Sequence, residues 1–418
     1  MIIIKKNINL FIVTIFIFTF LIYSVAFSYT PYNYSITLKE GIKFVHKTLV
    51  NYDSNGGNQE INYIEADLTN PNIYVSLSKA NNISSSKENL LNQLNQQKYN
   101  KNKNVLGGVN GEFFNVSNGQ PLFTTISDGE IFSIMDNEFD SSNRPIFYMD
   151  KHRNYSFDFF NVVGNLRFTN NKFKDLKINS LNRLNSHDDV NVSTYKINDE
   201  STYYPHEGLP SRYMLIQLMN SDGSIYPGVE IYGEVIDVGE MTSPKKIEKN
   251  QILVTSYGDE NYYNISYDSF KSVVSIKFDI YSSNDGRIRN DIKDAFTGYE
   301  YLIKNGEEMD YDYYKNLSEP SLINTRNART ALGLTPENKL ILFTVDKSKN
   351  SLGMSLKELS NYLKSMGISN AINLDGGGST SISFENNEGK LFLMNDPEKY
   401  QRKITNAISI IHNSKNKA

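Results

Sequence analysis

A short loop near the C-terminus carries residue types that suit the binding of a charged or polar ligand. It reads Asp375, Gly376, Gly377, Gly378, Ser379 and Thr380. Consecutive glycines let backbone N–H groups approach a ligand closely, and two hydroxyls add donors, so the loop suits a phosphate or sugar oxygen. The spacing and the lysine of a P-loop are absent, as is a dinucleotide-binding fingerprint. A glycine hairpin capped by the aspartate side chain is the alternative interpretation.

Two further segments carry charged groups in unusual settings. In Asn110-Gly111-Glu112-Phe113-Phe114, a carboxylate lies next to two aromatic residues. An apolar pocket would raise its pKa, as a general acid requires, whereas an exposed strand position would leave it without a role. In the segment 327–335, Arg329 precedes a strand-like run. Its guanidinium could grip a phosphate or carboxylate through two hydrogen bonds, or it could be a surface residue.

The elements around the glycine loop predict where its aspartate lies. Residues 338–346 and 371–374 have the apolar runs of buried strands, and a helix over 355–367 lies between them. Ser355 and Glu358 form a capping box at its start, and Gly367 marks its end. A strand, helix and strand with this connection favour a parallel crossover. We therefore expect Asp346 and Asp375 at the same edge of a sheet, where ligands usually bind.

The whole chain predicts an α+β fold with an α/β-like C-terminal part. We expect a mixed β-sheet with a few packed helices and an active site on loops at strand ends. Val229–Gly239 and Ser272–Tyr281 are the clearest strands of a long middle stretch, 120–290, which contains no repeat and is a candidate insertion. The predicted organisation is a leader (1–28), an N-terminal extension (29–58) and one domain (59–414).

The N-terminus and the composition bound the location and the chemistry. Two lysines precede an apolar run from Ile8 to Phe27, which predicts an export signal cleaved after Ser28 or an uncleaved membrane anchor. Either places the body of the protein outside the cytoplasm, secreted or at the cell surface. The chain has no cysteine, which excludes disulfides and thiolate sites. The net charge of −4, without a basic stripe, argues against a nucleic-acid partner.

In their order and spacing, these motifs resemble the phosphodiester glycosidase family, whose domain occurs in the lysosomal enzyme that uncovers mannose 6-phosphate. The matching motifs are N-G-x-F-F at 110–114, R-T-A-L-G at 329–333, the strand-end Asp346 and L-D-G-G-G-S-T at 374–380. The chain departs from the family at Asn327-Ala328, where His-Pro is usual, and at Lys347-Ser348, where Gly-Arg is frequent. It also has the bulkier Gly298-Tyr299-Glu300 before its Y-L-I-K-N-G segment.

The resemblance implies an exported bacterial hydrolase that cleaves a sugar 1-phosphodiester in a cell-envelope glycan or exopolysaccharide. It implies catalytic roles for Glu112, Asp375 and Asp346. The substrate-binding candidates are Asn110, Arg329, Thr330, Gly376, Gly377, Gly378, Ser379 and Thr380. No cofactor is firmly implied, although a divalent metal between Asp346 and Asp375 is left open. A non-catalytic envelope protein that binds a phosphorylated glycan is the alternative, and a membrane is a partner only if the leader is uncleaved.

Overall fold

The computed structural model describes most of the chain after residue 31. The described residues are 32–53, 57–134, 144–170, 172–184, 190–205, 208, 210–258, 262–310, 312–314, 323–395 and 402–413. The expected leader, residues 1–28, lies outside them. Within these ranges, none of the helices has the length and apolar character needed to cross a bilayer. Strands predominate, so the expected sheets with few helices are confirmed at this coarse level.

The first of two packed sheets carries the predicted motif strands. Its eight strands, in spatial order, are β1 (Tyr34–Lys39), β2 (Ile42–Leu49), β3 (Gln59–Asp67), β24 (Lys339–Val345), β23 (Arg329–Leu334), β27 (Asn370–Leu374), β21 (Tyr301–Lys304) and β22 (Glu307–Glu308). Residues 34–49, placed by the sequence in an extension, thus pair directly with β3. Helix α5 (Leu356–Ser365) begins at the predicted capping box and packs its leucines against this sheet.

The strand order corrects one expectation about this sheet. The sequence favours a parallel crossover between β24 and β27, but β23 lies between them and pairs antiparallel with both. The two strands therefore run in the same direction without being neighbours. Both still end at the same edge, as expected for the residues that follow them. Sequence spacing does not reveal that a third strand is inserted, because β23 precedes both in the chain.

The second sheet packs face to face on the first. Its order is β29 (Leu391–Leu393), β28 (Ile382–Glu385), β5 (Val105–Asn110), β30 (Asn406–His412) and β4 (Ile73–Lys79). Side chains such as Ile64 and Leu342 of the first sheet share one core with Val109 and Ile408 of the second. Glycine at 107 permits this approach, because a Cβ there would lie 2.7 Å from Cδ1 of Ile64. Helix α2 (Leu90–Asn95) and its continuation η2 (Gln96–Asn100) cover the outer face.

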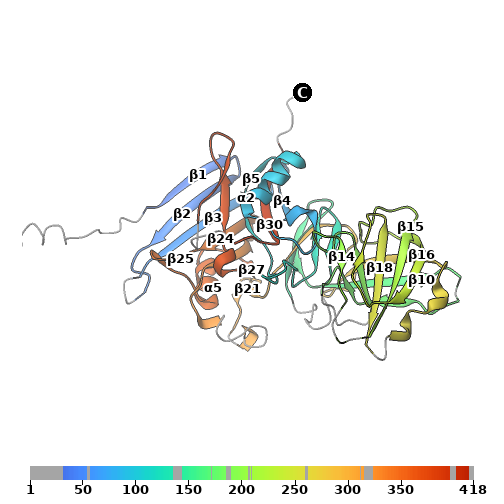
Figure 1. Cartoon of the computed structure of the whole chain (residues 1–418). Helices are drawn as coiled ribbons and strands as arrows, with labels where there is room; N and C mark the ends of the chain where they lie inside the picture. The colour runs from blue at the N-terminus through green and yellow to red at the C-terminus, as the bar shows by residue number, and fades with distance from the viewer. Residues whose placement is uncertain are drawn as a thin grey trace, which may run out of the picture.

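The middle stretch forms strands around a core of its own. An eight-stranded sheet has the order β11 (Leu176–Ile178), β10 (Phe160–Phe168), β19 (Val273–Ser282), β16 (Ile231–Glu240), β15 (Ser211–Leu218), β18 (Gln251–Tyr257), β13 (Val190–Thr194) and β12 (Ser180–Leu181). A five-stranded sheet has the order β7 (Glu130–Ser133), β6 (Thr125–Ser127), β20 (Ile292–Thr297), β8 (Ile146–Asp150) and β9 (Tyr155–Asp158). In Figure 1 the strands of the eight-stranded sheet gather in a lobe beside the two packed sheets. The two clearest predicted strands are confirmed as β16 and β19.

Candidate active site

A cleft of about 590 Å³ opens where several strands of the first sheet end. Residues from the loop after β27 line it together with residues that flank β23, β24 and β21. Among the predicted residues it contains Asp375, Gly376, Gly377, Gly378 and Arg329. The other lining residues are Phe113, Tyr299, Glu300, Asn327, Ala328, Lys347, Asn373 and Arg402. The cleft thus joins three of the segments singled out in the sequence, which are far apart along the chain.

The glycine loop holds its shape through hydrogen bonds from its own amides. The Gly376 N–H donates to the Asp375 carboxylate (2.9 Å), and the Gly377 N–H donates to the Ala328 carbonyl (2.8 Å). These two N–H groups are therefore not available to a ligand, so the loop has fewer backbone donors than the sequence predicted. Within the described part of the chain, the Gly378 N–H has no protein partner. It is the backbone donor of this loop that remains for an anion.

Asp375 is a partly exposed carboxyl group at the wall of the cleft. Burial by the surrounding protein raises the pKa of Asp375 to about 6, although the Ser379 hydroxyl, the Gly376 amide and the Arg402 guanidinium act in the opposite direction. A group with this pKa exchanges protons near neutral pH, as general acid or base catalysis requires. Asp375 thus has the position and the pKa that such a role requires, and its catalytic role stays a prediction.

Asn110 connects three elements beneath the loop. Its side chain is fully buried. Its Nδ2 donates to the Asp375 carbonyl (2.6 Å), and its Oδ1 accepts from the Thr330 hydroxyl (2.7 Å) and the Ser381 amide (3.1 Å). Asn110 and Thr330 are absent from the cleft lining. Their hydrogen bonds fit a structural role, in which they fix the backbone of Asp375, better than direct contact with a substrate.

Arg329 reaches the cleft but is largely committed to the protein. Its side chain is buried, its Nε donates to the Met354 carbonyl (3.0 Å), and its Nη2 donates to the Thr325 carbonyl (2.9 Å). Desolvation lowers the pKa of Arg329, and the nearby charge of Glu300 opposes this effect. Arg329 therefore contributes a fixed positive charge, with part of its donor set used by backbone carbonyls. Lys347 and Arg402 are the other cationic groups in the lining.

A second carboxylate in the cleft was not among the predicted site residues. Glu300 is buried and belongs to the segment that the sequence marked only as bulkier than usual. Asn373 N–H donates to the Glu300 carbonyl (2.9 Å), and Asn373 Nδ2 lies 3.4 Å from Glu300 Oε2. The buried Oδ1 of Asn373 has no hydrogen-bond partner, so this acceptor remains available to a ligand in the cleft. Because Asn373 lies in β27 and Asp375 directly follows this strand, two positions further on, strand alternation could have indicated their shared face.

Two aromatic rings also line the cleft. The rings of Phe113 and Tyr299 meet edge to face with their centroids 5.0 Å apart. The guanidinium carbon of Arg144 lies 4.1 Å from the centroid of the Tyr299 ring, and its Nη1 donates to the Tyr299 carbonyl. Rings of this kind present an apolar surface against which a sugar can pack. Phe113, rather than its neighbour Glu112, is the residue of the N-G-E-F-F motif that reaches the cleft.

Glu112 lies in the interior and does not line the cleft. Its carboxylate accepts three hydrogen bonds, from the Thr297 amide (2.8 Å), the Thr125 hydroxyl (2.9 Å) and Asn406 Nδ2 (2.7 Å). Burial raises the pKa of Glu112 to about 7, while these donors oppose the shift. The raised pKa agrees with the sequence argument. The geometry assigns Glu112 to holding β20, β6 and β30 together beneath Phe113.

Asp346 follows β24 at the expected edge, yet it is also absent from the lining. Its Oδ1 accepts from Asn395 Nδ2 (2.6 Å), which also donates weakly to the Thr380 carbonyl (3.3 Å). Asp346 thus supports the far end of the glycine loop through Asn395. The side chains of Ser379 and Thr380 are buried and do not line the cleft either. Across the described residues, no group of three His, Cys, Asp or Glu side chains could hold a metal ion.

Comparisons with known proteins agree with this arrangement of motifs. Residues 229–411 match the sequence model of the phosphodiester glycosidase family. Over these residues, which are less than half of the chain, the protein is similar to the phosphodiester glycosidase family. It is 34% identical over 101 residues to the mouse N-acetylglucosamine-1-phosphodiester alpha-N-acetylglucosaminidase and 33% identical over 102 residues to the human one. Each alignment covers 22% of this chain and 20% of the mammalian protein, so the chain spans about a fifth of those relatives.

The fold extends well beyond that aligned portion. A hypothetical protein from Synechocystis has a crystal structure that superposes with a TM-score of 0.70 over 92% of this chain and 64% of that one. Its sequence identity is 18%, so the likeness concerns the fold alone. The loop after β27 lies inside the part of the chain that matches the family model, and it lines the cleft.

Proposed function

We propose that the protein is an exported glycosidase that hydrolyses a sugar 1-phosphodiester of the N-acetylglucosamine-1-phosphodiester type in a cell-envelope or extracellular glycan. The observation that carries the proposal is the composition of the cleft, which pairs Asp375 and Glu300 with three cationic side chains. With both carboxylates ionised, the lining has one net positive charge. A phosphodiester carries one negative charge, so the cleft complements it.

In the proposed reaction, water attacks the anomeric carbon, and the bond from that carbon to the bridging oxygen breaks. The leaving phosphate takes the electron pair and departs as a phosphomonoester. Because phosphate is a good leaving group, proton donation to it matters less than in an ordinary glycoside. Ionised Asp375 accepts the proton of the water, and Glu300 stabilises the positive charge that develops on the sugar. Lys347, Arg402 and the Gly378 N–H hold the phosphate.

A direct test is to incubate the purified protein with a synthetic α-N-acetylglucosamine 1-phosphodiester and to measure released sugar. We expect release by the wild type and none by Asp375→Asn, which keeps the size of the side chain but cannot accept a proton. Absence of sugar release at high enzyme loading would count against hydrolysis.

One feature favours the alternative of a non-catalytic protein that binds a phosphorylated glycan. Asn327 and Ala328 stand where relatives usually have His-Pro, and both line the cleft. The Asp375→Asn variant separates the two functions. In an enzyme it abolishes turnover, whereas in a binding protein it leaves a pre-existing glycan affinity nearly unchanged while neither form releases sugar.

A further inference from the structure

A second pocket, of about 410 Å³, lies between the end of β4, the short turn η1 (Ala80–Asn82) and the helix formed by α2 and η2. Its size is within the range of small-molecule sites. All its lining side chains are polar, and six of them are carboxamides: Asn81, Asn82, Gln93, Gln96, Gln97 and Asn100. None of the residues that line the cleft of Asp375 contributes to it.

The amide side chains of the helix form a regular stripe. Gln93, Gln96, Gln97 and Asn100 occupy positions i, i+3, i+4 and i+7, which place them on one helical face. The leucines of the same helix pack into the core of the second sheet. From Gln96 to Asn100 the helix has the wider π geometry, an irregularity that occurs frequently at functional sites. A polar stripe facing a pocket is therefore built into this segment.

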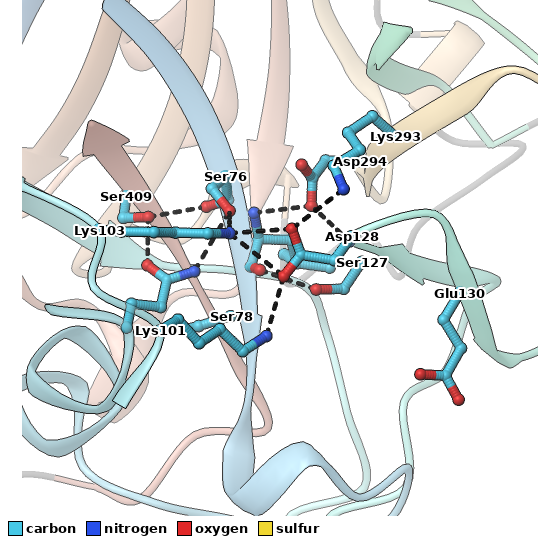
Figure 2. A network of polar contacts seen from close by, with 12 residues as sticks. Ser76, Ser78, Lys101, Lys103, Ser127, Asp128, Glu130, Lys293, Asp294 and Ser409 are labelled. Atoms are coloured by element: carbon cyan, nitrogen blue, oxygen red, sulfur yellow. Dashed lines mark hydrogen bonds and ion pairs between the residues drawn. The ribbon is translucent and has the colours of Figure 1, made fainter. Parts of the chain in front are cut away.

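Hydrogen bonds to the protein interior fix the side chains of the two buried glutamines in the inner part of the pocket. Gln93 Nε2 donates to the Ile404 carbonyl (2.8 Å), and its Oε1 accepts from the Ser78 hydroxyl (3.1 Å). Gln97 Oε1 accepts from Ser409 (2.5 Å). Figure 2 shows that Ser409 and Ser76 belong to a larger network that reaches Lys103 and Asp128. The buried amides thus have fixed orientations before any ligand arrives.

The outer part of the pocket offers amides that have no protein partner. Among the described residues, the side chains of Asn82, Gln96 and Asn100 make no hydrogen bond, and those of Asn82 and Asn100 are exposed. Asn81 and Asn82 both have left-handed backbone angles, with φ of 52° and 58°. Such angles are uncommon outside glycine, although asparagine tolerates them best. The chain maintains an irregular turn that presents amide groups at the rim of the pocket.

The charges in the pocket are already compensated or bonded. Lys101 forms an ion pair with Asp128 (2.9 Å), and the ammonium of the buried Lys79 donates to the Thr405 carbonyl (3.0 Å). No carboxylate and no aromatic ring contributes to the lining. Neither a strongly charged ion nor a flat aromatic ligand is therefore well matched. The free groups are planar amides, each with donors and an acceptor, which suit hydroxyls and other amides.

We propose that this pocket binds an uncharged, N-acetylated sugar unit of a glycan, separately from the cleft that contains Asp375. The carboxamides would pair with the acetamido group and the ring hydroxyls. The proposal does not depend on hydrolysis in the cleft. It would give the protein a second contact with a polymeric glycan.

The test is a calorimetric titration of the purified protein with a trimer of N-acetylglucosamine and, for comparison, a trimer of glucose. We expect the acetylated trimer to bind more tightly. Gln96→Ala and Asn82→Gly should each weaken its binding about three- to tenfold, the effect of losing one or two amide hydrogen bonds. Glycine at 82 retains the left-handed backbone, so this variant removes only the amide. Asn92→Ala, exposed on the same helix but outside the pocket, should leave binding unchanged.

Three results would overturn the proposal. The first is no binding of the acetylated trimer at millimolar concentration. The second is equal binding of the two trimers. The third is binding that survives both pocket variants but is weakened by Lys347→Met, because that outcome assigns the sugar to the cleft. Sugar release from the phosphodiester should be the same in Gln96→Ala, Asn82→Gly and the wild type, so a failure of hydrolysis is recognised independently.

Discussion

The side chain of Asn110 provides the sharpest test of how the glycine loop is held. Replacement by alanine removes three hydrogen bonds in the interior and leaves the Asp375 carbonyl, the Thr330 hydroxyl and the Ser381 amide without their partner. Each buried group left unsatisfied costs about 1–3 kcal/mol. The surrounding protein can relax, and a water molecule can enter the space left by the side chain, so part of this cost is recovered. We therefore expect the free energy of unfolding to fall by about 3–6 kcal/mol.

The assay is urea-induced unfolding followed by circular dichroism. Thr330→Val removes one partner of Asn110 and should cost about 1–2 kcal/mol. In the double variant the two losses should not add, with a coupling of about 1 kcal/mol, because the residues share a hydrogen bond. Asn92→Ala, an exposed position, should change stability by less than about 0.5 kcal/mol.

The same variant separates a positioning role from a substrate contact. If Asn110 only fixes the Asp375 backbone, its loss should lower kcat for phosphodiester hydrolysis with little change in KM. A stability loss below about 1 kcal/mol, together with a raised KM and an unchanged kcat, would refute this reasoning and return Asn110 to the role of a sugar ligand.

Three other measurements address the charges. Because Asp375 must be ionised to accept a proton and burial raises its pKa to about 6, kcat/KM should rise with pH through about 6; a fall over that range would make it the acid instead. Lys347→Met should raise KM about two- to fivefold at low salt and less at high salt, while Lys349→Met, exposed and outside the cleft lining, should not. Burial raises the pKa of Glu112 from 4.5 to about 7, so the folded state holds its proton more tightly. This group's contribution to stability is full below pH 4.5 and is lost, by up to about 3 kcal/mol, as pH rises to 7. In pH-dependent thermal unfolding, Glu112→Gln should flatten that slope, and an unchanged slope would contradict the shift.

The sequence predicted the strand end that carries Asp375 because the glycine motif follows well-marked elements. The capped helix and the apolar strands on either side of it placed Asp375 at a strand end, and the structure agrees. The sequence did not predict which residues surround each of these side chains in the folded protein. Glu112 is held by partners as distant in the chain as Asn406, and Asp346 by Asn395. The local sequence pattern does not indicate which distant residue will donate a hydrogen bond to a given carboxylate.

Some residues that line the cleft were not predicted from the sequence, for a different reason. Glu300 and Asn373 are brought together by backbone pairing between the segment before β21 and the end of β27. That pairing joins β21 to β27, which are about 65 residues apart in the chain, and no pattern in the sequence indicates that these two strands are neighbours. Arg402 lies beyond the glycine loop in a stretch without a recognisable pattern. In the middle lobe the sequence predicted two of the strands, but it did not predict the order of the strands in their sheet.

Each of the three glycines of the loop has its own physical reason, and these reasons bear on the choice between a turn and a binding loop. A Cβ on Gly376 would lie 2.8 Å from the Ala328 carbonyl, so this glycine allows the loop to approach the start of β23. Gly377 has φ of +59°, which favours glycine, and its N–H bonds to the same carbonyl. Gly378 lines the cleft with an amide that no described group uses. Two glycines therefore build the turn, and the turn is what leaves the third amide for a ligand.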